Sequence, residues 1–366
     1  MIDVTNRLCV RGNIQTHGLH IPIDQRPDWT VVQQWTIPSS TIVSPIIVID
    51  NSRTIAFVCS KEFQNIYAHI PLYLRVQEFL TKDGKQLTKW FYKVQASGGI
   101  NRWLGIDNPI IPSFIMANKR CNGLTSELAT TLLKGLNVSK STTLDTYTYL
   151  NLPHKAKGKL RELQQKNALL LKMNPDVHFQ GIVKGSTQEQ NRLHIQELQD
   201  LGITEFIFHA GDYICQGTKA ETRAAQVFAW EIRKRVDHLI IYGIGAKKWI
   251  DTFSFADSIV TLNHIIEPHN GVFTTETGKI VRQRHQKRHP TQTTFDQHIA
   301  GFPQSSLDAT LFRNSPWNSF RRIHRDFANR DRSSTYATAL CIDGGEECSF
   351  LSTICLTCPH LLRGCC

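Results

Sequence analysis

Hydrophobic and polar positions alternate in blocks between residues 177 and 262, and these blocks predict strands that alternate with helices. Three apolar runs indicate strands: Val177–Ser186, Glu205–Tyr213 and His238–Lys248. Each run is rich in β-branched and aromatic residues and ends in a short polar or glycine-rich segment, as expected for strands covered on both faces. A fourth segment, Phe255–Thr261, carries an aspartate where the next loop of the site is expected.

Helix signals lie between these strands. Thr187 and Gln190 can form a capping box, and leucines at helical spacing then lead to Gly202, where we expect the helix to end. Thr218 and Glu221 repeat this arrangement ahead of a second amphipathic segment. Strands that alternate with helices predict a parallel sheet with right-handed crossovers, in which all strands end at the same edge.

The residues at the strand ends are therefore candidates for one site, because ligands of such folds bind at the edge where the strands end. These candidates are Gly185, His209, Gly211, Gly243, Gly245 and Asp257. Any one of the glycines can equally serve only to let a strand turn tightly into a helix. Four such junctions in sequence, with an aspartate at the fourth, favour a site.

The same junctions resemble the motifs of the tRNA-guanine transglycosylase superfamily. GIVKGS, FIFHAG, IIYGIG and FADS follow one another in the order of that family, and Leu144–Asn151 lies where the family has its base-reading aspartate. The resemblance covers about Thr142–Val281 and implies a TIM-like (β/α)8 barrel. It also implies a pentosyltransferase that exchanges guanine in DNA or tRNA for a 7-deazaguanine base such as 7-cyano-7-deazaguanine.

The resemblance also implies roles for individual residues. Asp257 stands at the position of the nucleophile, a carboxylate that attacks C1′ and stabilises an oxocarbenium-like state. Asp145 stands at the base-reading position, where one carboxylate can accept hydrogen bonds from both N1–H and the exocyclic amine of guanine. The implied substrate site further includes Lys184, Gly185, His209, Ala210, Gly211, Gly243 and Gly245. Backbone N–H groups around Gly185, Ala210 and Gly211 are expected to hold the carbonyl oxygen of the base.

The sequence departs from the family pattern at several positions. Lys184 replaces a glutamine, Ser186 replaces a glycine, and the first active-site aspartate of the family has no counterpart in Gln95–Gly99 or Pro109–Phe114. These differences indicate a divergent branch and leave two alternatives open. One is a nucleic-acid-binding relative that has lost the chemistry. The other is a different barrel enzyme that acts on a small ligand, such as a nucleoside hydrolase or a phosphate-binding lyase.

The positive charge of the chain favours a nucleic-acid partner. The chain of 366 residues has 42 Lys and Arg against 31 Asp and Glu, a net charge of +11 that favours polyanions through counterion release. Two basic clusters, Lys279–Arg288 and Arg321–Arg332, follow Asp257, with Trp317 and Phe320 placed to stack on bases. The expected nucleic-acid contacts are Arg282, Arg284, Lys287, Arg288, Arg321 and Arg322. A solvated basic face is the alternative.

Cysteines gather near the end of the chain. The set Cys341, Cys348, Cys355 and Cys358 has the ligand type of a structural Zn²⁺ site. A disordered cysteine-rich tail is the alternative, and disulfides are disfavoured in a cytoplasmic chain. We expect residues 1–310 to form the barrel domain and residues 311–366 to form a basic extension that contains these cysteines.

The remaining segments complete the expectations. No apolar run reaches the roughly 18 residues of a membrane span, and Met1–Val10 has no signal-peptide pattern. We therefore expect a soluble, cytoplasmic protein without a membrane partner, and a homodimer is left open. The pattern predicts a hairpin at Pro45–Ser60, a helix at Leu160–Met173 and a linker at residues 282–316.

Overall fold

The computed structural model describes most of the chain between residues 32 and 339. The described ranges are 32–35, 46–49, 52–147, 153–214, 219–269, 272–282, 306–329 and 336–339. Several predicted site residues lie outside these ranges, namely Arg284, Lys287, Arg288, Cys341, Cys348, Cys355 and Cys358. Within these ranges, no helix combines the length and the apolar character that crossing a bilayer requires.

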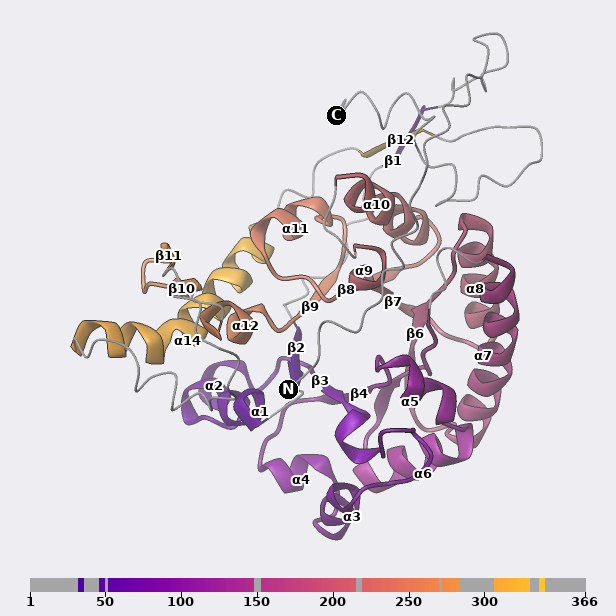
Figure 1. Cartoon of the computed structure of the whole chain (residues 1–366), viewed down its shortest axis with the longest axis horizontal. Coiled ribbons are helices and arrows are strands. Elements are labelled where there is room, and N and C mark those ends of the chain that lie inside the picture. The colour runs from indigo at the N-terminus through magenta and orange to yellow at the C-terminus, as the bar shows by residue number, and fades with distance from the viewer. Residues whose placement is uncertain are drawn as a thin grey trace, which may run out of the picture.

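Eight parallel strands form one curled sheet, with helices on its outer side (Figure 1). The hydrogen-bonded order is β4-β3-β2-β9-β8-β7-β6-β5, so β9 lies beside β2. Each connection contains at least one helix, because parallel neighbours need a crossover. The strands of the sheet are β2 (Ile46–Ile49), β3 (Leu72–Arg75), β4 (Ile110–Ser113), β5 (Lys140–Thr142), β6 (His178–Val183), β7 (Glu205–His209), β8 (His238–Tyr242) and β9 (Ser258–Thr261).

The two end strands of this order, β4 and β5, also lie close to each other. The backbone N–H of Phe114 donates to Thr142 Oγ1 at 3.0 Å, and Ser141 Oγ donates to the carbonyl oxygen of Pro112 at 3.2 Å. Side-chain hydrogen bonds therefore join the two end strands of the curled sheet. An α/β architecture with a curled parallel sheet agrees with the fold class predicted from the sequence.

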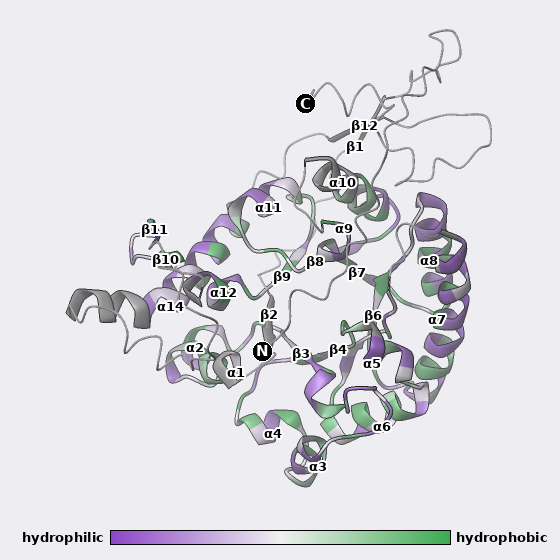
Figure 2. Cartoon of the chain, viewed as in Figure 1, coloured by the Kyte–Doolittle hydropathy of each residue, from purple (hydrophilic) through white to green (hydrophobic). Residues whose placement is uncertain are grey.

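The helices bury one face each against the outside of the sheet. Figure 2 shows hydrophilic and hydrophobic residues alternating along α7 and α8, the pattern of a helix with one buried face. Thr187 Oγ1 caps α8 by accepting the N–H of Gln190 at 3.1 Å, and Gly202, with φ +85°, follows the end of this helix, as predicted. The helices are α1 (Ser52–Val58), α2 (Lys61–Tyr67), the 3₁₀ helix η3 (Val76–Phe79), α3 (Lys89–Ala96), α4 (Ile100–Leu104), α5 (Asn118–Gly123), α6 (Ser126–Leu136), α7 (Pro153–Met173), α8 (Gln188–Asp200), α9 (Ala210–Tyr213), α10 (Lys219–Arg233), α11 (Lys247–Thr252), α12 (Asn263–His269) and α14 (Ser306–Ala328).

Two layers of apolar side chains cover the two faces of the sheet. One layer lies between the sheet and the helices. The other lies inside the curl and consists of Tyr73, Ile111, Ile115, Ile182, Ile207, Ile240, Tyr242 and Val260. Because side chains alternate along a strand, Lys184 projects to the same side as Ile182. Polar residues at the strand ends therefore continue the inner apolar layer.

The predicted hairpin at Pro45–Ser60 is wrong in its second half. β2 forms as expected, but Ser52–Val58 is helix α1 and β2 pairs in parallel with β3. Phe57 is buried, with its ring centroid 4.5 Å from that of Trp317 on α14. This packing outweighs the strand propensity of the apolar run, which depends on context.

The C-terminal part of the described chain is also more ordered than the composition suggests. α14 begins at Ser306, so the predicted linker is wrong from that residue onward, and the boundary expected after residue 310 falls inside this helix. Phe320 and Ile323 on α14 are fully buried in the layer between the sheet and the helices. Two short antiparallel pairs are separate from the main sheet, β1 (Val32–Trp35) with β12 (Tyr336–Ala339), and β10 (Val272–Thr274) with β11 (Ile280–Arg282).

Candidate active site

Four polar side chains meet where β5, β6 and β7 end, at what we call the C-terminal edge of the sheet. Asp145 follows β5, Lys184 follows β6, His209 is the last residue of β7, and Asp212 lies in α9 directly after it. Parallel strands bring these ends to one edge, so residues far apart in the sequence become neighbours. We call these four residues the Lys184 cluster.

Lys184 lies at the centre of the cluster. Its side chain is 1% exposed, and its Nζ lies 3.0 Å from Asp145 Oδ1 and 2.5 Å from Asp212 Oδ2. Nδ1 of His209 lies 3.1 Å from Asp212 Oδ1, so Asp212 is placed between a lysine and a histidine. A buried ammonium group needs such partners, because an unpaired charge is costly to remove from water. The structure thus brings together Asp145, Lys184 and His209, as the sequence predicts, and adds Asp212.

The two carboxyl groups of the cluster have opposite pKa shifts. Burial raises the pKa of Asp145 above its ordinary value, and the charge of Lys184 offsets only part of this effect. Burial also acts to raise the pKa of Asp212, but the charges of His209 and Lys184 outweigh it and hold that pKa well below its ordinary value. A pair of carboxyl groups with diverging pKa values is suited to separate roles, one as a proton carrier and one as a fixed anion.

Lys184 itself is a permanent cation. Burial acts to lower the pKa of Lys184, but the charges of Asp145 and Asp212 outweigh burial and raise the pKa above its ordinary value. A lysine that forms a Schiff base has to be neutral when it attacks a carbonyl group. The lysine therefore orients and stabilises the two carboxylates rather than acting as a nucleophile.

Side chains of α8 and α9 hold the loop that follows β6. The backbone N–H of Lys184 donates to His194 Nδ1 at 3.1 Å, and the Tyr213 hydroxyl donates to the carbonyl oxygen of Gly185 at 2.9 Å. Burial lowers the pKa of His194 to about 4, so the ring is neutral and can accept. A Cβ on Gly185 would lie 2.6 Å from Asn191 Oδ1. Gly185 therefore allows this loop to pack closely on α8.

Two predicted glycines lie beside the ring of His209. Gly243 follows β8 with φ +90°, a conformation that favours glycine, and a Cβ there would lie 3.5 Å from His209 Cδ2. A Cβ on Gly211 would lie 3.2 Å from His209 Nε2. Gly245 has a packing role instead, because a Cβ there would meet Thr261 Oγ1 at 2.0 Å. Gly211 and Gly243 thus let the backbone run close to the histidine ring, whereas Gly245 lets its loop approach the end of β9.

Asp257 is not part of the Lys184 cluster, which corrects the placement expected from the sequence. It directly precedes Ser258, the first residue of β9, and therefore lies at the opposite edge of the parallel sheet. Its Oδ2 accepts hydrogen bonds from the Leu239 N–H at 2.8 Å and from Arg233 Nη1 at 3.1 Å, and its side chain is fully buried. The apolar pair at residues 255–256 reads like the end of a strand, but the strand begins only after the aspartate.

Asp212 is the member of the cluster that the sequence analysis missed. It lies in α9, where Ala210 is fully buried and Asp212 reaches Lys184. A signal was present in the sequence, because Asp212 is the first carboxylate after β7 just as Asp145 is the first after β5.

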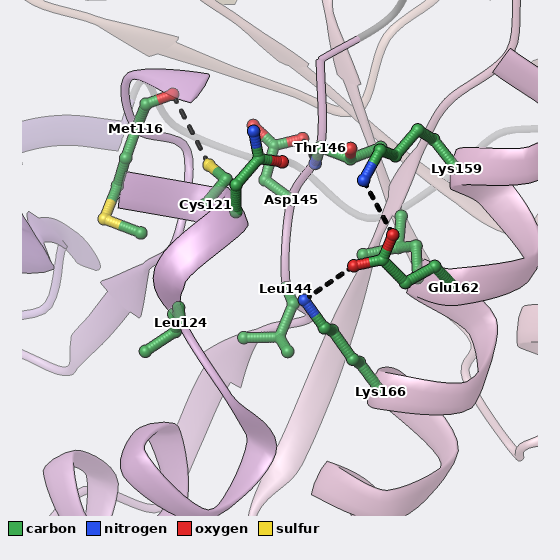
Figure 3. A pocket seen from close by; sticks show the side chains of 11 residues that line it. Met116, Cys121, Leu124, Leu144, Asp145, Thr146, Lys159, Glu162 and Lys166 are labelled. Carbon is green, nitrogen blue, oxygen red and sulfur yellow. Dashed lines mark hydrogen bonds and ion pairs between the residues drawn. The ribbon is translucent and has the colours of Figure 1, made fainter. Parts of the chain in front are cut away.

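A small pocket lies beside Asp145, between α5, the loop after β5, and α7 (Figure 3). On its α7 side, Glu162 forms ion pairs with Lys159 at 2.7 Å and with Lys166 at 3.0 Å. On its α5 side, burial raises the pKa of the Cys121 thiol to about 12, so Cys121 is not a thiolate nucleophile. The pocket is lined by Met116, Cys121, Asn122, Leu124, Leu144, Asp145, Thr146, Lys159, Glu162, Leu163 and Lys166.

The predicted nucleic-acid contacts divide into exposed and buried residues. Arg282 at the end of β11 and Arg321 on α14 are exposed. Arg322 is buried, and its Nη2 donates to Glu267 Oε2 at 2.6 Å, which corrects its expected role as a free phosphate contact. Trp317 and Phe320 pack into the core with Phe57 and do not form a stacking surface. Of the predicted contacts that the structure describes, two are thus exposed, Arg282 and Arg321.

The predicted zinc ligands all lie outside the described residues. In the described part of the chain, no three His, Cys, Asp or Glu side chains are placed to hold a metal ion together. Cys59 and Cys121 are free thiols there. The zinc site stays a prediction that rests on the cysteine pattern.

No family model matches the chain, and no curated protein matches its sequence.

Proposed function

We propose that this chain exchanges guanine in DNA or tRNA for a 7-deazaguanine base at the Lys184 cluster, with Asp212 rather than Asp257 as the nucleophile. The observation that carries the proposal is that one buried lysine contacts two carboxyl groups with opposite pKa shifts. Displacement at C1′ of a nucleoside passes through an oxocarbenium-like state. Such a state needs one carboxylate that stays ionised and one group that moves a proton.

The spacing of the two carboxyl groups supports a covalent mechanism. Asp145 Oδ1 and Asp212 Oδ2 both contact Lys184 Nζ, at 3.0 and 2.5 Å. These oxygens therefore cannot lie much further apart than the ~5–5.5 Å that is typical of glycosidases with a covalent intermediate. Base exchange with retained configuration needs two displacements, and a glycosyl-enzyme intermediate provides both.

The proposed steps balance without a further reactant. In the first displacement, an Asp212 oxygen forms a bond to C1′ while the bond from C1′ to guanine breaks, and Asp145 gives its proton to the leaving base. In the second, the incoming base attacks C1′, the bond to Asp212 breaks, and the proton of the incoming base passes to Asp145. Lys184 and His209 keep Asp212 ionised between these steps.

The architecture is part of the same proposal. We propose that the curled sheet is a complete (β/α)8 barrel, which the hydrogen bonds between the ends of β4 and β5 support. Active sites of such barrels lie at the C-terminal ends of the strands, where the Lys184 cluster lies. A structural zinc in the C-terminal extension and a DNA or tRNA partner belong to this proposal as well.

A nucleic-acid-binding relative without catalysis is the second candidate. The observation that favours it is that Lys184 already satisfies both carboxylates within the chain, as a purely structural network does. Such buried networks can serve conformational specificity rather than chemistry. The two candidates differ in whether the protein forms a covalent bond to its substrate.

Exchange of labelled guanine into tRNA and duplex DNA tests the proposal. We expect the wild-type protein to exchange label with one of these substrates and to leave a protein–nucleic acid adduct on a denaturing gel. Asp212→Asn should form no adduct, while a circular dichroism spectrum like that of the wild type shows that it is folded. Exchange at the wild-type rate by folded Asp212→Asn contradicts the proposal. Binding of nucleic acid without any exchange by the wild type supports the second candidate.

A further inference from the structure

The outer face of α3 combines basic and aromatic side chains. Phe91 and Val94 of this helix are buried in the core. Lys89 and Lys93 are one turn apart and exposed, and helical spacing places them near the middle of the opposite face. The helix therefore presents a ridge of two ammonium groups to solvent.

Aromatic rings flank this ridge. Trp90 and Tyr92 are 43% and 57% exposed, which is high for large side chains with apolar rings. The Trp90 ring is fixed in place, since Lys93 Nζ lies 4.7 Å and Lys89 Nζ 5.9 Å from its centroid, and the ring of Trp103 on α4 lies 6.4 Å away. Cation–π contacts of this kind preorganise both the ring and the charges.

The surroundings of the ridge are also basic. Of the three carboxylates between residues 76 and 107, Glu78 and Asp107 are exposed, and Asp83 Oδ1 accepts two hydrogen bonds within its own loop at 2.6 and 3.2 Å. We define the α3 surface as Lys82, Lys85, Lys89, Trp90, Tyr92, Lys93 and Arg102, all of which are exposed. Its positive charge makes it complementary to a polyanion.

The loop that carries Lys82 and Lys85 connects the α3 surface with α5, which forms one wall of the pocket that contains Asp145. The loop before α3 packs directly on α5, because a Cβ on Gly84 would lie 2.2 Å from the carbonyl oxygen of Arg120 and a Cβ on Gly123 would lie 1.8 Å from that of Asp83. α5 then contributes Cys121 and Asn122 to the wall of this pocket (Figure 3). α5 is therefore in contact with both the loop of the α3 surface and the pocket beside Asp145.

We propose that the α3 surface binds a single-stranded segment of nucleic acid, with phosphates on Lys89 and Lys93 and bases stacked on Trp90 and Tyr92. Proteins that bind single strands combine a basic track with exposed rings in this way. A helix that lies on a membrane has apolar residues at the centre of its exposed face, whereas here the lysines are central. The inference shares its nucleic-acid partner with the proposed function but does not depend on base exchange.

Fluorescence anisotropy of labelled single-stranded and duplex oligonucleotides, as DNA and as RNA, tests this inference with the full-length protein. We expect Trp90→Ala and Tyr92→Ala each to weaken single-strand binding about tenfold or more, because stacking of one base is worth ~1–3 kcal/mol. Trp90→Phe should retain most of the affinity. Lys89→Gln/Lys93→Gln should reduce the slope of log K against log salt by about one unit, given ~0.7 per phosphate on single strands.

Matched controls remove the same groups elsewhere. Lys134→Gln/Lys172→Gln takes two exposed lysines from α6 and α7, and Leu193→Ala takes an apolar side chain that is 50% exposed on α8. The inference is overturned if the α3 variants bind like these controls, or if Trp90→Ala weakens duplex and single-strand binding equally. It is also overturned if the α3 variants lose binding only to anionic phospholipid vesicles. Anisotropy measures binding alone, so a failure of base exchange leaves this result readable.

Discussion

Arg233 and Asp257 form an ion pair that is closed off from water, with Arg233 Nη1 3.1 Å from Asp257 Oδ2 and side chains that are 1% and 0% exposed. The same Nη1 atom donates to the carbonyl oxygens of Val236 and Asp237 at 3.1 and 2.9 Å. The guanidinium therefore ties the turn after α10 to the start of β9. This arrangement makes Asp257 a structural residue at the edge of the sheet opposite the Lys184 cluster.

Asp257→Ala should lower the free energy of unfolding by about 3–5 kcal/mol, because it leaves Arg233 buried without its partner. Urea unfolding measures this change. Asp251→Ala, on the exposed side of α11, is the control and should change stability by no more than about 0.5 kcal/mol. A stable Asp257→Ala protein that has lost base exchange would return the nucleophile to Asp257.

Asp212 and Asp145 should differ in how their replacement affects exchange. Asp212→Asn removes the attacking oxygen and should lower kcat by about 10⁴-fold or more, as loss of a nucleophile does. Asp145→Asn removes a proton carrier and should lower kcat by about 10²–10⁴-fold. Single-turnover exchange with each folded variant makes the comparison. Equal and small effects of both changes would contradict the separate roles.

Lys184→Gln should shift the pH profile of kcat/KM rather than abolish activity. The charges of His209 and Lys184 together hold the pKa of Asp212 below its ordinary value, so losing the lysine raises that pKa. Asp212 has to be ionised to attack, and the acid limb of the profile should therefore move to higher pH. An unchanged acid limb would mean that Lys184 does not control the charge of the nucleophile.

The sequence predicts the strands around the site well, because β6, β7 and β8 are continuous apolar runs with clear helix signals between them. It misplaces Asp257 because two apolar segments flank this residue and either one can be the strand. Pairing with the neighbouring strand makes the second segment the strand, since Ser258 pairs with Ile240 of β8. Such pairing is a property of the neighbouring strand and is invisible in the local sequence.

Long-range packing limits the other predictions in the same way. Arg322 and Phe320 look like an exposed basic and aromatic cluster in the sequence, but α14 turns both toward the core. The partner of Arg322 is Glu267, which is distant in the chain and belongs to α12. The Lys184 cluster shows the opposite case, because strand ends of a parallel sheet meet by topology. The strand-end pattern predicts His209, and the family resemblance predicts Asp145 and Lys184.

Stability should fall in mild acid because of His264. Burial lowers the pKa of His264 to about 3, and neither ring nitrogen has a hydrogen-bond partner among the described residues. Between pH 6.5 and 3 the unfolded chain binds a proton that the folded chain does not, so stability decreases as the pH falls, by about 1.4 kcal/mol per pH unit. His264→Phe should remove this contribution in urea unfolding at several pH values, whereas His194, whose pKa burial lowers to about 4, keeps its own. His154→Gln, at an exposed position on α7, should leave the pH dependence unchanged.

Arg321 and Arg322 are adjacent on α14 and should respond differently to the same change. Arg321 is exposed, so Arg321→Gln should leave stability within about 0.5 kcal/mol of the wild type. If Arg321 contacts a phosphate, this variant should also lower the salt dependence of duplex binding by about one unit. Arg322→Gln breaks the 2.6 Å bond to Glu267 and should cost about 3 kcal/mol of stability while leaving the salt slope unchanged. One salt titration and one urea titration of each variant make the test.

Two outcomes would contradict these expectations. A reduced salt slope for Arg322→Gln would mean that this arginine leaves Glu267 to bind the phosphate backbone. An unchanged salt slope for Arg321→Gln would mean that α14 presents a solvated basic face.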